Sequence, residues 1–158
     1  MLDKLILLLS KLIIGVSRMY IVKSFCVAFL MFVSFVVNAQ EVDAPESVSG
    51  TTRISAEDLI DLVDEEDDLV IIDSRILKDR KGGFIEGSIS LPDIDTTPAA
   101  LAEIIPTKST PVIFFCNGAK CGRSVVASKM AVSEGYTNVY WFRGGWEEWV
   151  NKNLPISK

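Results

Sequence analysis

The feature that most constrains the fold is a set of short apolar runs separated by segments with helical periodicity. Three runs, at 69–72, 112–115 and 139–142, consist of Val, Ile, Leu and aromatic residues. Runs of this length that are apolar on both faces are typical of strands buried in a parallel sheet. This alternation predicts an α/β fold with a mostly parallel sheet. The intervening helices are expected at about 55–64, 97–105, 124–133 and 146–151.

Residues 1–39 have the pattern of a targeting segment. Two apolar runs, at 5–16 and 24–37, lie among basic residues, and the second is followed by Asn38 and Ala39. A basic stretch, an apolar stretch and a small residue at the cleavage point make up a secretory signal peptide, here cleaved after Ala39. Met19 is an alternative start of this segment. The expected location is therefore the periplasm or the exterior, and an uncleaved segment that anchors the protein in a membrane is the alternative.

The rest of the chain predicts a linker and one domain. Residues 40–52 are rich in acidic residues, Pro and Ser and predict a linker, and 53–158 are long enough to bury one hydrophobic core. The chain has 21 acidic and 16 basic residues, a formal net charge of −5. Because nucleic acids bind to basic surfaces, the composition predicts no nucleic-acid partner.

A cysteine loop follows the central apolar run, and it contains the candidate site. A strand that leads a cysteine into a loop at a helix N-terminus favours the thiolate, since backbone N–H groups and the helix dipole stabilise an anion. We predict Cys116 and Cys121 as the catalytic pair, with Cys116 favoured as the nucleophile and Cys121 open as the alternative. The predicted substrate-binding residues are Asn117, Gly118, Ala119, Lys120, Gly122, Arg123 and Ser124.

The chain contains no histidine, which excludes several reaction classes. Neither a Ser-His-Asp triad nor a Cys-His pair is possible, so hydrolysis by an activated Ser or Cys is disfavoured. Two cysteines without histidine also fall short of the four ligands of a structural zinc site. No phosphate-binding or dinucleotide-binding motif is present, so the sequence predicts neither a metal nor a cofactor. The class of reaction that remains is one in which a thiolate attacks sulfur or exchanges with a disulfide.

Four blocks of sequence follow one another between about Arg53 and Ile156. The first is a strand that ends in Asp-x-Arg, the second a Phe-Ile-x-Gly segment that ends in Pro, and the third the strand, cysteine loop and Arg-Ser helix start. The fourth is a Gly-Gly-x-x-x-Trp segment that ends in Leu-Pro. They lie at 69–75, 84–92, 111–124 and 144–155. In this order and spacing, they resemble a single-domain rhodanese, a sulfurtransferase.

This resemblance implies a five-stranded, mostly parallel sheet flanked by helices on both faces. It also implies that Cys116 takes a sulfane sulfur from a small anionic donor, such as thiosulfate or polysulfide, and holds it as a persulfide. The acceptor would be a thiol or cyanide, and Arg123 would contact the donor. The loop from Cys116 to Arg123 has eight residues and is longer than the usual loop of the family. The second loop cysteine resembles an exported bacterial type with paired cysteines.

Two other functions stay open from the sequence. In the first, Cys116 and Cys121 form a thiol–disulfide redox or sensing module, because a spacing of five residues lets their Cα atoms approach to a disulfide's separation. In the second, the domain is catalytically inactive and the lengthened loop binds a protein partner.

Overall fold

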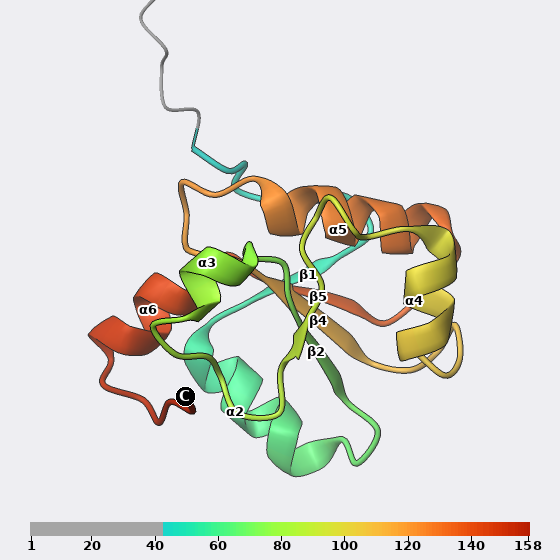
Figure 1. Cartoon of the computed structure of the whole chain (residues 1–158). Helices are drawn as coiled ribbons and strands as arrows, with labels where there is room; N and C mark the ends of the chain where they lie inside the picture. The colour runs from blue at the N-terminus through green and yellow to red at the C-terminus, as the bar shows by residue number, and fades with distance from the viewer. Residues whose placement is uncertain (1–42) are drawn as a thin grey trace, which may run out of the picture. The chain divides into compact units, whose positions relative to one another are not determined.

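The computed structural model describes residues 43–158, and its centre is a five-stranded sheet in which every pair of neighbouring strands is parallel. The strand order is β1-β5-β4-β2-β3, so the central strand β4 lies between β5 and β2 (Figure 1). This confirms the predicted α/β class and sheet. The predicted signal segment 1–39 lies outside the described residues. The strands are β1 (Thr52–Ile54), β2 (Val70–Asp73), β3 (Ile89–Ser90), β4 (Val112–Phe115) and β5 (Val139–Phe142).

Two of the helices begin where the sequence supplies a capping side chain. Ser55 and Asp58 form a reciprocal capping box at the start of α2, and the side chain of Thr97 accepts a hydrogen bond from Ala100 N–H at the start of α4. The short α3 lies in a stretch for which the sequence predicted no helix. The helices are α2 (Ala56–Glu65), α3 (Leu77–Arg80), α4 (Pro98–Ile104), α5 (Arg123–Ser133) and α6 (Gly145–Asn151).

Alternating side chains along the strands build one core on each face of the sheet. Ile72 and Phe114 are fully buried on the face that α4 and α5 cover. Their chain neighbours Ile71 and Phe115 point to the opposite face, where Leu59 of α2 and Trp149 of α6 pack. Helices therefore cover both faces, as Figure 1 shows. Both faces of the central strands are buried from solvent, which explains why their sequences are apolar without interruption.

The described part of the predicted linker is packed on the domain. Ala44 and Val48 are buried and share a small core cluster with Val125 and Trp141. Ala44 N–H donates a 2.7 Å hydrogen bond to Ala119 O, which ties this segment to the cysteine loop. Residues 43–52 are therefore part of the folded unit, because their small apolar side chains fill space beside Trp141. Within residues 43–158, no helix is long and apolar enough to cross a membrane.

Candidate active site

The cysteine loop lies at the carboxyl edge of the sheet, where ligands bind in parallel α/β folds. Cys116 directly follows β4, and the loop ends where Arg123 begins α5. The N-terminus of α6 holds the start of this loop. Trp146 N–H donates to Cys116 O at 2.9 Å, and Glu147 N–H donates to Asn117 O at 2.8 Å. One segment that is distant in the sequence therefore holds the backbone of Cys116 and Asn117.

Gly145 makes this contact between α6 and the loop possible. Its φ of +54° lies in the left-handed region, and a Cβ atom there would overlap the carbonyl oxygen of Cys116. Gly118, on the loop side, faces Glu147, whose carboxylate would lie 2.6 Å from an added Cβ. The close approach of the two backbones thus explains Gly145, whereas an added Cβ at Gly118 would first meet the end of a flexible side chain.

A disulfide joins Cys116 and Cys121, with a Cα–Cα distance of 6.3 Å. The two sulfur-bearing residues differ in accessibility. Cys116 is 2% exposed, and its Sγ lies 3.1 Å from the carbonyl oxygen of Cys121. Cys121 is half-buried and lines a cleft of about 600 Å³. The other residues that line this cleft are Asp93, Asn117, Gly118, Lys120, Gly122, Arg123, Val126 and Glu147.

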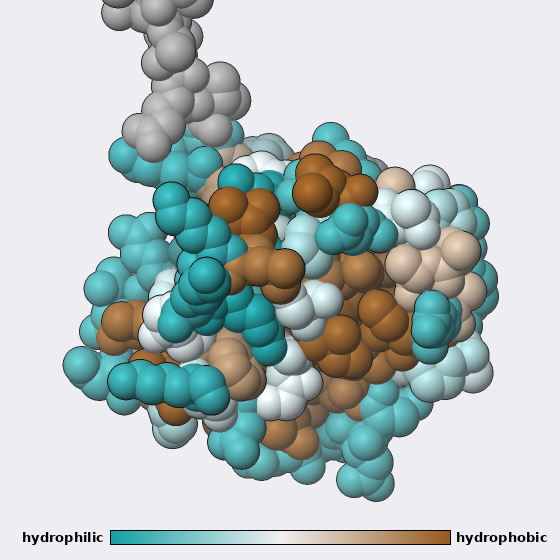
Figure 2. Space-filling view, in the orientation of Figure 1, coloured by the Kyte–Doolittle hydropathy of each residue, from teal (hydrophilic) through white to brown (hydrophobic). Residues whose placement is uncertain are grey.

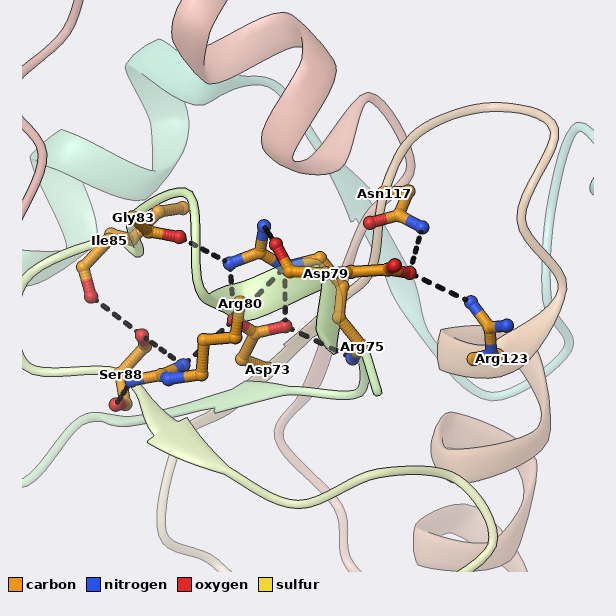
Figure 3. A network of polar contacts seen from close by, with 9 residues as sticks. All are labelled: Asp73, Arg75, Asp79, Arg80, Gly83, Ile85, Ser88, Asn117 and Arg123. Carbon is orange, nitrogen blue, oxygen red and sulfur yellow. Dashed lines mark hydrogen bonds and ion pairs between the residues drawn. The ribbon is translucent and has the colours of Figure 1, made fainter. Parts of the chain in front are cut away.

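Arg123 lies between two carboxylates at this cleft. Its guanidinium is 3.6 Å from a carboxylate oxygen of Asp79 and 3.5 Å from one of Asp93. Asp79 also accepts a 2.8 Å hydrogen bond from the Asn117 side chain, so it bridges the loop and the arginine, as Figure 3 shows. Arg123 Nη1 lies 3.8 Å from Cys121 Sγ. The arginine that the sequence assigned to an anionic donor therefore already has two anionic partners.

Two other predicted site residues have structural contacts. Ser124 is buried, and its hydroxyl accepts a 3.0 Å hydrogen bond from Trp141 Nε1, so it faces the core and not the cleft. Ala119 contributes its carbonyl to the contact with Ala44.

Neither Gly118 nor Gly122 has a positive φ, so neither supplies a left-handed turn in the loop. Gly122 has open space around it and precedes α5 as its N-cap.

Three carboxylates at the cleft were not predicted as site residues. Asp79 belongs to α3, Asp93 follows β3, and Glu147 lies in the first turn of α6. Their sequence signal is positional, because each follows a strand whose carboxyl end lies at the same edge of the sheet. Within residues 43–158, no group of three or more Cys, Asp or Glu side chains is arranged to hold a metal ion.

A second, buried ionic cluster contacts the segment that holds the cysteine loop. Arg75 and Asp73 are fully buried and joined by side-chain hydrogen bonds of 2.7–3.1 Å. Arg80 adds a 2.7 Å bond to the same carboxylate (Figure 3). The Arg75 guanidinium lies 4.4 Å from the ring of Trp146, the residue whose N–H binds Cys116 O. This cluster therefore positions the residue that positions the cysteine.

The sequence of residues 55–152 matches the family model of the Rhodanese-like domain. The chain belongs to this family. The match spans all of the predicted cysteine loop and runs from the N-cap of α2 to the end of α6. A sulfurtransferase family accounts for a strand-end cysteine without a histidine partner.

Similar proteins agree with this assignment. A rhodanese domain-containing protein of Drosophila melanogaster is 34% identical over 97 residues, which are 54% of this chain and 85% of that protein. The solved thiosulfate sulfurtransferase of Pseudomonas aeruginosa is 28% identical with a TM-score of 0.59, over 68% of this chain and only 20% of that longer one. A human single-domain sulfurtransferase has the same fold, with 24% identity and a TM-score of 0.55, over 65% of this chain and 97% of its own.

Proposed function

We propose that this rhodanese-like domain transfers sulfane sulfur through a persulfide on Cys116. A thiol reductant first opens the disulfide. The Cys116 thiolate then attacks the outer sulfur of thiosulfate or a polysulfide, so that a new S–S bond forms, the donor's S–S bond breaks and its electron pair leaves with sulfite or the shortened polysulfide. An acceptor thiolate or cyanide next takes the terminal sulfur, and Cys116 leaves as a thiolate.

The observation that carries the proposal is the position of Cys116 in a member of this family. It directly follows the central strand, in a loop that leads to the positive end of an eleven-residue helix. Partial charges at a helix N-terminus stabilise a thiolate and the developing negative charge on sulfur. No imidazole is needed, because the attack is on sulfur and the departing groups are stable anions.

Intact mass of the reduced full chain after exposure to thiosulfate or polysulfide tests the proposal. We expect a gain of one sulfur, about 32 Da, that is lost in Cys116→Ser and kept in Cys121→Ser. The matched pair of variants removes one thiol each from the same loop. A full gain in Cys116→Ser would move the persulfide to Cys121, and no gain with any donor would refute sulfur carriage.

A thiol–disulfide redox or sensing module is the second candidate function, and the disulfide favours it. Cys116 and Cys121 would cycle between dithiol and disulfide, with two electrons and two protons supplied by a partner dithiol. The test is the redox state of the protein trapped with an alkylating agent as cells are lysed. A reducible bond between the two cysteines supports this function, and free thiols or a persulfide argue against it.

We further propose that the protein works in the periplasm or outside the cell. The support is the predicted signal segment 1–39 together with a cysteine pair that suits an oxidising compartment. N-terminal sequencing of protein recovered from a periplasmic extract tests it. A new N-terminus after Ala39 is expected. An intact N-terminus in the membrane fraction would instead support the anchored alternative.

A further inference from the structure

We propose that the oxidised loop reacts at Cys121 and that its acidic rim selects a thiol next to positive charge, such as a cysteine in a basic polypeptide segment. This inference deepens the second candidate function. It rests on the disulfide and is independent of whether Cys116 carries sulfane sulfur.

Accessibility assigns the attacked sulfur. Thiol–disulfide exchange requires a thiolate to reach one sulfur in line with the S–S bond, so the reachable sulfur is attacked and the other leaves. Cys121 lines the cleft, whereas Cys116 is 2% exposed and is not among the residues that line it. The leaving sulfur is then Sγ of Cys116, which follows β4. The N-terminus of α5 stabilises the negative charge of this leaving thiolate.

The charges around Cys121 determine which thiols approach it. Asp93 and Glu147 line the cleft, and Asp79 is ion-paired with Arg123 at its edge. Arg123 and Lys120 also line the cleft, so its lining alone is balanced, and Asp79 at the edge supplies the third carboxylate against these two cations. The rim is therefore net negative, and both carboxylates nearest Arg123 are only partly exposed, at 29% and 22% of their side chains. A negative rim repels anionic thiols and attracts cationic ones.

The size of the cleft favours a polypeptide over a small thiol. A volume of about 600 Å³ suits a ligand of several side chains, since clefts of ~300–1,000 Å³ bury drug-sized molecules. The cleft also has an apolar side, because Val126 lines it and is 51% exposed, and Ile94 beside Asp93 is 79% exposed. Figure 2 shows apolar side chains on the face that carries α5 and the segment between β3 and α4.

The exchange step is balanced without any further reactant. The partner thiolate attacks Cys121 Sγ, so that a partner–Cys121 S–S bond forms and the Cys116–Cys121 bond breaks. The electron pair passes to Cys116, which becomes a thiolate. A second thiolate of the partner then attacks the partner's own sulfur in the mixed disulfide and releases reduced Cys121, and the partner leaves oxidised.

Three small thiols measure the charge preference on the oxidised full chain. Cysteamine is cationic, 2-mercaptoethanol neutral and 3-mercaptopropionate anionic. Each rate constant is divided by that of the same thiol with a neutral model disulfide, which removes differences in thiol nucleophilicity. At low ionic strength we expect the normalised rate of cysteamine to exceed that of 3-mercaptopropionate about five-fold. The ratio should approach one in 1 M salt, where the Debye length is about 3 Å.

Variants and peptides locate the preference. Asp93→Asn and Glu147→Gln should lower the ratio, and Glu103→Gln on α4, which removes the same charge elsewhere, should not. A cysteine peptide flanked by lysines should react faster than one flanked by glutamates and faster than cysteamine. If the normalised rates of cysteamine and 3-mercaptopropionate are equal in the unmodified protein, the charge selection is wrong. If the lysine-flanked peptide reacts more slowly than cysteamine, the proposal of a polypeptide partner is wrong.

Peptide mapping identifies the attacked sulfur. Trypsin cleaves after Lys120 and therefore separates the two cysteines. After acid quenching and alkylation, we expect the cysteamine adduct on Cys121 and the alkyl group on Cys116. The reverse pattern would refute the assignment.

A protein in which the disulfide never forms would refute the redox function itself, whereas a disulfide that forms without charge preference would refute only this inference.

Discussion

Two arginine–carboxylate clusters lie at the same edge of the sheet, and they differ in almost every physical respect. In the buried cluster, Arg75 and Asp73 are 0% exposed and their closest atoms are 2.7 Å apart. In the cleft cluster, Arg123 is 34% exposed and lies 3.5–3.6 Å from Asp79 and Asp93. Short hydrogen bonds in a dry site fix geometry, whereas longer and hydrated ion pairs exchange partners readily.

The difference separates the support of the site from its selectivity. The buried cluster contacts Trp146, and Trp146 N–H holds the Cys116 carbonyl. The cleft cluster contacts Cys121, at 3.8 Å from Arg123, and faces solvent. The same residue types therefore fix the loop in one place and tune its charge in the other.

The largest effect is expected from Arg75→Met. Removing this guanidinium leaves buried Asp73 with Arg80 as its remaining ionic partner and deprives Gly83 O of a 3.0 Å hydrogen bond. We expect the free energy of unfolding to fall by about 3–5 kcal/mol, as measured by urea denaturation.

Arg123→Met is the matched control, because it removes the same group from the partly exposed cluster. A loss below about 1 kcal/mol is expected there. Equal losses in the two variants would contradict the distinction between the clusters.

A smaller loss is expected from Gly145→Ala, which strains the link between the buried cluster and the loop. The added Cβ meets the Cys116 carbonyl, and the backbone has a φ of +54°. We expect about 1–3 kcal/mol less stability and a lower yield of persulfide, because the carbonyl of Cys116 loses its fixed position. Gly82→Ala, at an exposed position with open space around it and no positive φ, should change neither measurement. An undisturbed persulfide yield in the Gly145 variant would show that α6 does not position the cysteine.

The sequence predicted the fold from the periodicity of its longer elements. β4 and β5 have the bounds of their apolar runs, and the capping residues Ser55 and Thr97 mark two helix starts. β1 and α3 were not predicted as elements, because three and four residues are too few to show a period. β1 forms as a strand because it pairs with β5, and this pairing is a tertiary interaction that the local sequence does not show.

The candidate site was only half predictable for a similar reason. The cysteine loop is one continuous segment, so its residues could be named. The carboxylates that surround it come from three other segments, and only the strand order brings them together. Ser124 was assigned to the site as the predicted start of the helix after the loop, but one helical step of about 100° from Arg123 turns it toward Trp141.

Asp79→Asn tests the selectivity of the cleft cluster. Loss of this charge leaves Arg123 with Asp93 alone, so the arginine is freer to contact an anion. In the reduced protein we expect the rate of persulfide formation with thiosulfate to rise about three- to ten-fold at low salt. Stopped-flow or quenched-flow mass measurements give this rate. Glu103→Gln is again the control for net charge, and an equal rise there would assign the effect to the whole protein and not to the rim.

The smallest effect is expected from a third ionic cluster, which is exposed and serves as a reference for the other two. Lys152 Nζ donates to Glu57 at 2.5 Å and to Glu148 at 2.9 Å. The hydrogen bond from Lys152 lowers the pKa of Glu57 from 4.5, and the bonds to Glu57 and Glu148 raise the pKa of Lys152 from 10.5. These carboxylates and the ammonium are solvated, so their mutual attraction is screened.

The sign of each pKa shift fixes the pH dependence of this reference cluster. The contribution of Glu57 is present above its ordinary pKa of 4.5 and is lost as pH falls through the lowered folded value. The contribution of Lys152 is present below 10.5 and is lost as pH rises through the raised folded value. Urea denaturation of the unmodified protein and Lys152→Gln should therefore differ slightly between these limits and converge outside them. Lys129→Gln is the control for removing one surface charge. A difference as large as that of Arg75→Met would show that burial does not decide which ionic cluster holds this fold.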